Sequence, residues 1–133
     1  MTQRYVRRII IFEVEAPKRP NVEEEIKWLC RCLGLDPDKD RLAFEIFLHL
    51  LAANRKGDGV KTIDITKNSN VTQAAVVYHM NLFMRSGLVV KRGAKYFLRG
   101  ATLGETIAQM EADVMRRMDM LKAIGRRIDE QMI

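Results

Sequence analysis

The chain has 133 residues, 47% of them hydrophobic and 30% charged, a size that allows one compact domain with an appendage but not two full domains. No apolar stretch is long enough to cross a bilayer, the N-terminus lacks a secretory signal, and two closely spaced cysteines suit a reducing compartment, so we expect a cytoplasmic protein without a membrane span. The net charge of +6 lies within residues 52–100, where nine basic and two acidic side chains give +7, which favours a polyanionic partner over a merely solubilising face.

The first 35 residues contain a predicted strand, a linker and a helix. Residues 4–15 alternate in polarity and include a β-branched run, which favours a strand that needs a partner or a cover. Pro17 and Pro20 stiffen the following connection, so residues 1–20 form one N-terminal unit. Asn21 is a good N-cap, and Gly34 is placed to end the helix. Its expected apolar face consists of Val22, Ile26, Leu29, Cys30 and Leu33.

The middle of the chain predicts three helices followed by a hairpin. The first helix is apolar over most of its circumference, as expected at the centre of a core. Thr62 or Asp64 caps the second helix, Thr72 caps the third, and Gly87 ends it. The predicted helices and strands lie at 38–54, 62–68, 72–86, 88–91 and 95–98.

Residues 71–98, VTQAAVVYHMNLFMRSGLVVKRGAKYFL, resemble the recognition helix and wing of ArsR/MarR-type transcription regulators. The resemblance covers residues 40–104 and implies a winged helix-turn-helix at 21–100 that binds double-stranded DNA. We therefore expect a mainly α fold with a small β-wing, preceded by the N-terminal strand and helix and followed by a long C-terminal helix. The matching residues are Val71, Val76, His79, Met80, Phe83, the run Gly87-Leu88-Val89, Tyr96, Leu98 and Gly104.

The third predicted helix would enter the major groove of DNA and present side chains to base edges. Gln73 is suited to adenine and Val77 to a thymine methyl group, whereas hydroxyl and amide side chains suit phosphates or mixed contacts. The residues expected to face the core are Val71, Val76, Met80 and Phe83. The residues expected to face DNA are Thr72, Gln73, Val77, Tyr78 and Asn81.

Most of the affinity for DNA is expected from outside this helix, whose only fixed charge is Arg85. Basic side chains in the wing and before the third helix are the expected phosphate ligands. These cations are Lys67, Lys91, Arg92, Lys95 and Arg99.

Residues 101–133 predict one long helix that begins with a capping box at Thr102 and Glu105. About 30 residues make a helix about 45 Å long, which is longer than the domain needs and unstable with its apolar stripe exposed. Packing of two copies would bury the stripe, so we predict a homodimer, with a helix folded onto its own domain as the alternative. The expected interface residues are Ile107, Met110, Val114, Leu121, Ile124 and Ile128, with Arg117 as a polar interruption.

We expect no metal, no cofactor and no enzymatic activity. Cys30-Arg31-Cys32 has the spacing of a metal-sensing thiolate pair, but it precedes the winged domain, and side chains two apart on a helix point about 200° apart. His49 and His79 are far apart in sequence, and no Ser/His/Asp grouping or phosphate-binding loop is present.

We therefore predict a sequence-specific transcription regulator, a repressor that occupies its promoter as a homodimer. One alternative is an architectural DNA-binding protein with little sequence preference, favoured by the few polar groups on the third helix. Another is a docking module of the transcription or replication machinery, which has no need of clustered wing cations. The first 35 residues fit none of these templates and are expected either to extend the dimer interface or to hold a protein partner.

Overall fold

The computed structural model describes residues 15–67 and 69–133. The described part of the chain is mainly helical with one small antiparallel sheet, as predicted. Residues 4–14 of the predicted N-terminal strand lie outside the described residues. The elements in chain order are α1 (Val22–Cys32), α2 (Arg41–Arg55), α3 (Thr62–Thr66), α4 (Gln73–Arg85), β1 (Val89–Arg92), β2 (Lys95–Leu98) and α5 (Leu103–Gln131).

The predicted N-caps of α1, α4 and α5 are confirmed. Asn21 Oδ1 accepts a hydrogen bond from the Glu24 N–H at 3.0 Å, and Thr72 Oγ1 accepts one from the Ala75 N–H at 3.1 Å. Thr102 Oγ1 likewise accepts from the Glu105 N–H at 3.0 Å. The Glu105 carboxylate reaches back to the N–H of Ala101, one residue before the expected partner. Short local patterns were therefore sufficient to locate these three helix starts.

The helix predicted to begin near Asp38 begins three residues later, because residues 36–40 form a turn of their own. The Asp36 carbonyl accepts hydrogen bonds from the N–H groups of Lys39 and Asp40. Asp40 then caps α2, its carboxylate accepting from the Ala43 N–H at 3.0 Å. At the start of α3, the Asp64 carboxylate accepts from the Lys61 N–H at 2.8 Å, so Lys61 is the N-cap residue rather than Thr62 or Asp64.

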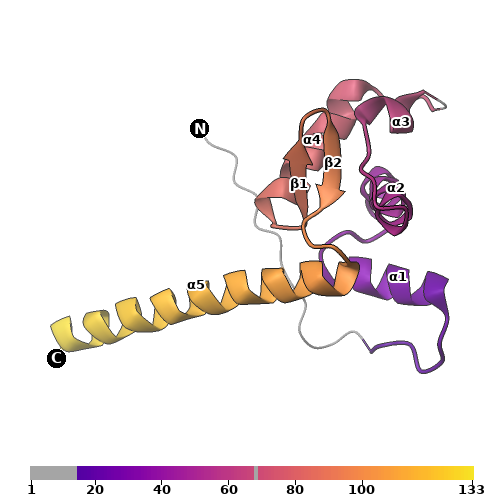
Figure 1. Ribbon diagram of the computed structural model, residues 1–133. Coiled ribbons are helices and arrows are strands. Elements are labelled where there is room, and N and C mark those ends of the chain that lie inside the picture. The colour runs from indigo at the N-terminus through magenta and orange to yellow at the C-terminus, as the bar shows by residue number, and fades with distance from the viewer. Residues whose placement is uncertain (1–14, 68) are drawn as a thin grey trace.

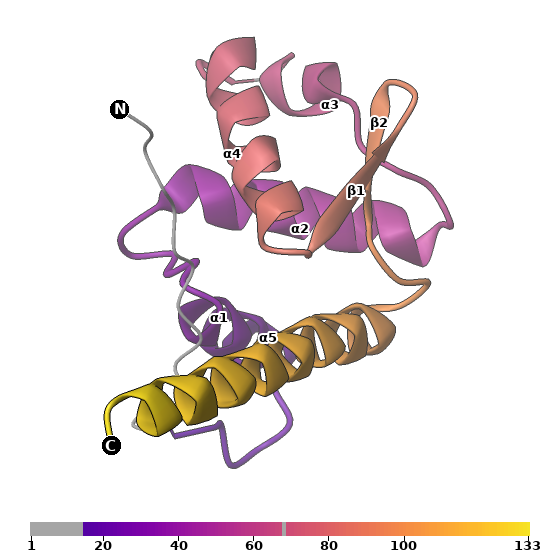
Figure 2. The same cartoon turned by 90° about the vertical axis from the view of Figure 1, so that its left-hand side faces the viewer.

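The hydrophobic core is built around α2. In Figures 1 and 2, α3 and α4 lie above α2, and α1 and α5 lie below it. Ile46, Phe47 and Leu50 of α2 are almost completely buried. Val22 is largely exposed, which contradicts its predicted place on the apolar face of α1. The core residues from the other elements are Cys30, Leu33, Leu35, Val60, Ile65, Val76, Met80, Phe83, Leu88, Val89, Tyr96, Leu98 and Met110.

The hairpin of β1 and β2 is joined to the connection between α2 and α3. Val89 pairs with Leu98 at one end of the hairpin, and Arg92 pairs with Lys95 beside the turn. The backbone of Val60 exchanges two hydrogen bonds of 2.8 Å with that of Tyr96, which extends the sheet by one isolated bridge. This bridge fixes the hairpin to the start of α3.

Helix α5 belongs to the domain at one end and projects from it at the other (Figure 1). Thr106 and Met110 are buried, and Ile107 packs partly buried against the core. Met110 is therefore a core residue of one chain, which corrects its predicted place in a dimer interface, and Ile107 packs against the same core. The first turns of α5 therefore share one core with the preceding domain, and the domain boundary expected at residue 101 divides that core. None of the helices in the described ranges is long and apolar enough to cross a membrane.

The connection to α5 requires glycine at position 100. A Cβ atom on Gly100 would lie 2.8 Å from the backbone nitrogen of Thr106 and 2.9 Å from Glu105 Cβ. We predict that Gly100→Ala lowers the free energy of unfolding by about 1–3 kcal/mol, the usual cost of overpacking. Gly104→Ala is the matched control, because its nearest neighbour would be Thr102 Oγ1 at 3.9 Å. Alanine favours a helix over glycine by up to about 1 kcal/mol, so Gly104→Ala should not destabilise. Equal urea midpoints for the two variants would contradict the prediction.

Candidate nucleic-acid interface

Helix α4 presents one buried and one solvent-facing side. Val76, Met80 and Phe83 are completely buried, as predicted, and Val71 packs partly buried beside the core. The exposed side carries Gln73, Tyr78 and Asn81, whereas Val77 is only half-exposed. Thr72 is exposed, but its hydroxyl oxygen already accepts the capping hydrogen bond. Of the predicted contact residues, Gln73 and Asn81 therefore offer exposed polar groups suited to base edges or phosphates.

His79 fixes the orientation of α4 relative to α2. Its Nδ1 lies 2.9 Å from the Ala75 carbonyl oxygen, and its Nε2 lies 3.0 and 3.2 Å from the two carboxylate oxygens of Asp40. Asp40 is also the N-cap of α2, so one carboxylate serves both helices. The sequence did not reveal this contact, because the two residues are 39 positions apart and neither belongs to a local motif.

Two exposed cations at the end of β1 are held over aromatic rings. Lys91 Nζ lies 5.3 Å from the centre of the Tyr96 ring, and Arg92 Cζ lies 4.7 Å from the centre of the Phe97 ring. At these distances a cation is attracted to the face of the ring. The contacts keep both side chains along the hairpin while both residues remain exposed to solvent. Lys91 and Arg92 are therefore fixed positive charges available to a partner.

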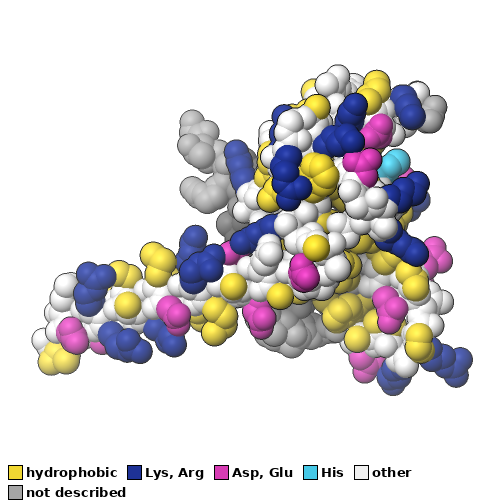
Figure 3. Space-filling model, viewed as in Figure 1, with side chains coloured by type: hydrophobic (Ala, Val, Ile, Leu, Met, Phe, Trp, Pro, Cys, Tyr) yellow, Lys and Arg dark blue, Asp and Glu magenta, His cyan; other side chains and the backbone are white. Residues whose placement is uncertain are grey.

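Lys95 lies on the same hairpin, but its charge is partly balanced. Its Nζ lies 2.8 Å from Asp58 Oδ1, in the turn after α2. The hydrogen bond from Lys95, followed by that from the Gly59 N–H, lowers the pKa of Asp58 below its ordinary value, so this carboxylate stays ionised. Lys67, the other predicted cation before α4, is exposed at the end of α3. Figure 3 shows Lys and Arg side chains over the hairpin and α3 with Asp or Glu side chains among them, and side chains of both signs along the projecting part of α5.

Arg99 does not join the exposed cations, although the sequence grouped it with them. Its guanidinium donates to the two carboxylate oxygens of Asp113 at 2.5 and 3.2 Å, and to the Gly87 carbonyl at 3.3 Å. Asp113 also receives a hydrogen bond from Arg116. Arg99 thus joins the end of the hairpin to α5, and we leave it out of the candidate interface. The spacing of cations alone could not distinguish this residue from its neighbours.

The surroundings of the two cysteines disfavour the thiolates that a metal-binding pair requires. Cys30 is completely buried, and burial raises the pKa of its thiol to about 12. Burial also raises the pKa of the half-exposed Cys32 thiol. Both shifts disfavour the thiolate, which is the form that binds metals. Among the described residues, no group of three or more His, Cys, Asp or Glu side chains is arranged to hold a metal ion.

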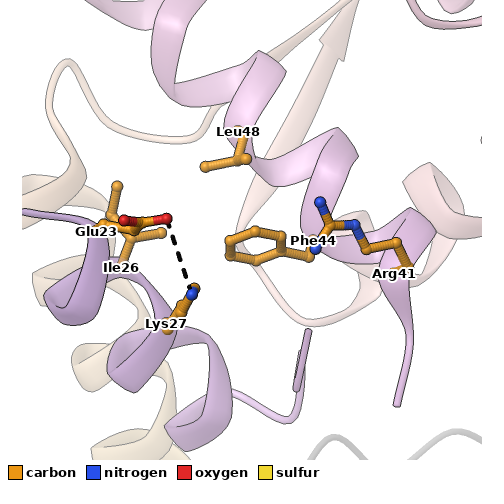
Figure 4. A pocket seen from close by; sticks show the side chains of 6 residues that line it. All are labelled: Glu23, Ile26, Lys27, Arg41, Phe44 and Leu48. Carbon is orange, nitrogen blue, oxygen red and sulfur yellow. Dashed lines mark ion pairs between the residues drawn. The ribbon is translucent and has the colours of Figure 1, made fainter. Parts of the chain in front are cut away.

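A small hollow lies between α1 and α2, away from the hairpin (Figure 4). Its volume is about 180 Å³, below the range of about 300–1,000 Å³ that is typical of small-molecule sites. The Glu23 carboxylate and Lys27 Nζ face each other across 3.8 Å beside it. The hollow is lined by Glu23, Ile26, Lys27, Arg41, Phe44 and Leu48. Its size gives no support to an effector pocket.

The ion pair of Arg99 and Asp113 predicts a pH-dependent stability. Hydrogen bonds from Arg99 lower the pKa of Asp113, so the stabilisation is present above the ordinary carboxyl pKa of about 3.9 and is lost as the pH falls through the lowered value. We predict that Asp113→Asn costs up to about 1 kcal/mol at pH 7, since the pair is partly exposed, and that the difference from the parent protein disappears in acid.

Denaturant unfolding at pH 7 and at successively lower pH measures this difference. Asp119→Asn is the matched control, because Asp119 meets Lys122 at 3.6 Å on the exposed part of α5. An equal effect of both substitutions at pH 7 would show that Arg99 and Asp113 do not hold α5 to the domain.

Known proteins assign no function to this surface. No family model, no curated protein and no solved structure matches the chain.

Proposed function

We propose that this protein is a winged helix-turn-helix DNA-binding protein that regulates transcription as a homodimer. The observation that carries the proposal is the pair of exposed, ring-supported cations Lys91 and Arg92 on a hairpin that directly follows α4. In this assignment α3 and α4 are the helix-turn-helix, α4 is the recognition helix, and β1 with β2 is the wing. The bridge between Val60 and Tyr96 supports it, because the bridge joins the wing to the segment that leads into α3.

The wing supplies affinity and α4 supplies sequence discrimination. Lys91 and Arg92 neutralise phosphates and release counterions, a term that is independent of sequence. Gln73 and Asn81 offer amide groups, and an amide side chain recognises adenine by two hydrogen bonds in the major groove. The small number of polar groups on α4 also suits an architectural protein with little sequence preference, which is the second candidate function.

The homodimer is supported by the exposed apolar stripe of α5. Val114, Leu121, Ile124 and Ile128 are between 42% and 57% exposed, although they follow the same helical spacing as buried Met110. Exposed apolar surface of this regularity marks an interaction site. A partner helix of the same sequence would cover it and would bring two recognition helices onto one DNA duplex.

We predict that the double variant Lys91→Ala/Arg92→Ala weakens DNA binding at every sequence. The slope of log K against log[salt] should fall by about 2 for each protein chain, because each phosphate contact contributes about 0.9. Arg126→Ala/Arg127→Ala removes the same charge from exposed positions on α5 and should leave the slope unchanged. Fluorescence anisotropy of labelled duplexes at several salt concentrations measures both. Equal slopes for the two variants would show that Lys91 and Arg92 do not contact DNA phosphates.

Binding of labelled genomic fragments, including the protein's own promoter, separates the candidate functions. A preferred fragment held at physiological salt with at least ~10³-fold selectivity supports the specific regulator. Equal binding of all fragments that falls steeply with salt overturns the regulator and favours the architectural protein. Lack of binding even at low salt overturns both and leaves a protein-docking role for the hairpin and α4.

Light scattering at micromolar concentration tests the homodimer. We predict a dimeric mass for the parent protein and a monomeric mass for Leu121→Asp, because a carboxylate in the apolar stripe would be buried without a partner. Met115→Asp is the matched control, since Met115 is 56% exposed against 57% for Leu121 but lies off the stripe. Neither side chain belongs to the domain core, so both variants should keep the folded domain, and a monomeric Leu121→Asp should lose helix only in the projecting part of α5. A monomeric mass for the parent protein would end the homodimer proposal.

A further inference from the structure

One face of α5 is used in two different ways along its length. Leu103, Ile107 and Met110 pack against the core of the same chain, and Thr106 beside them is completely buried. From Val114 onward the same face is exposed, up to the end of the helix at Gln131. This exposed segment is about 26 Å long at 1.5 Å per residue. The surface available to a second copy therefore begins where the domain ends.

The packing of the first turns of α5 against the domain core disfavours a parallel pair of α5 helices. In a parallel pair, each helix runs beside the apolar face of the other at the same level. At the level of Thr106 and Met110 that space is filled by the core of the domain. A parallel pair in register also places the two Arg117 side chains next to each other within the apolar seam, where like charges repel in a poorly solvated site.

An antiparallel pair avoids both problems. If the exposed segment of one helix covers the same segment of its partner, Val114 lies opposite Gln131, and Leu121 lies opposite Ile124. Arg117 then lies opposite Ile128, and the two Arg117 residues are about 16 Å apart along the axis. Alternating contacts of this kind are the layers of an antiparallel coiled coil. The two domains lie at opposite ends of the pair, where neither blocks the other helix.

We infer that α5 associates with a second copy of itself as an antiparallel pair centred between Leu121 and Ile124, a conclusion that rests on the proposed homodimer. The two-fold axis crosses the helices near residues 122 and 123. The starts of the two α5 helices are then about 60 Å apart, at about 1.5 Å per residue.

Distances between spin labels at the end of α5 test the direction of the pair. Gln131→Cys places a label on the last residue of the helix, which is exposed. The antiparallel pair predicts about 27 Å between the two labelled positions, and a parallel pair predicts about 10 Å. Every labelled protein also carries Cys32→Ser, so that the half-exposed native thiol does not react with the label. Cys30 is buried and is left in place. The Cys32→Ser protein without an added cysteine controls for background labelling.

A label at Ala123→Cys is the matched control, because residue 123 lies near the axis and off the stripe and gives similar distances in both arrangements. Light scattering on the same labelled samples reports the mass. A dimer with long separation at position 131 supports the inference. A dimer with short separation there overturns the antiparallel arrangement and leaves the homodimer intact. A monomeric mass overturns the homodimer itself, and DNA binding is measured separately in either case.

Discussion

The burial of one broad face of α2 is the constraint on which the other elements depend. Ile46, Phe47 and Leu50 are almost completely removed from water, and each such side chain contributes about 1.5–3 kcal/mol relative to an exposed one. Helices α1, α4 and α5 and the hairpin supply the apolar side chains that cover α2. Asp40 at its first turn adds directional contacts, since it caps α2 and also meets His79 of α4. The position of the proposed recognition helix thus follows from the packing of α2.

The four cations of residues 91–99 have two different tasks in the fold. Arg99 and Lys95 are paired with Asp113 and Asp58, which lie on other elements. Such pairs hold the hairpin to the rest of the domain more than they attract a partner. Lys91 and Arg92 lie instead over aromatic rings, which hold the side chains without neutralising them. An anionic partner would therefore meet these two residues as exposed charges without a carboxylate partner, together with the exposed Lys67 at the end of α3.

Helix α5 carries one amphipathic pattern that serves folding in its first turns and association farther along in the proposed homodimer. Its first turns complete the core of the domain, and the hydrogen bond from the Gly100 N–H to Thr106 Oγ1 fixes where it begins. The remaining turns are too far from the domain to be covered by it (Figure 1). In the proposed homodimer a second copy covers this apolar stripe, and its direction is limited by the domain at the other end.

The sequence by itself determined the elements, because their signals are local. N-caps at Asn21, Thr72 and Thr102, the helix-ending Gly87 and the hairpin turn at Gly93 each act within a few residues, and each was placed correctly. The inward residues of α4 followed from helical periodicity. Tertiary structure alone decided which cations are exposed and which part of α5 is free. The pairing of the cations depends on Asp113 and Asp58 meeting residues 14 and 37 positions away, and no pattern of neighbouring residues encodes such contacts.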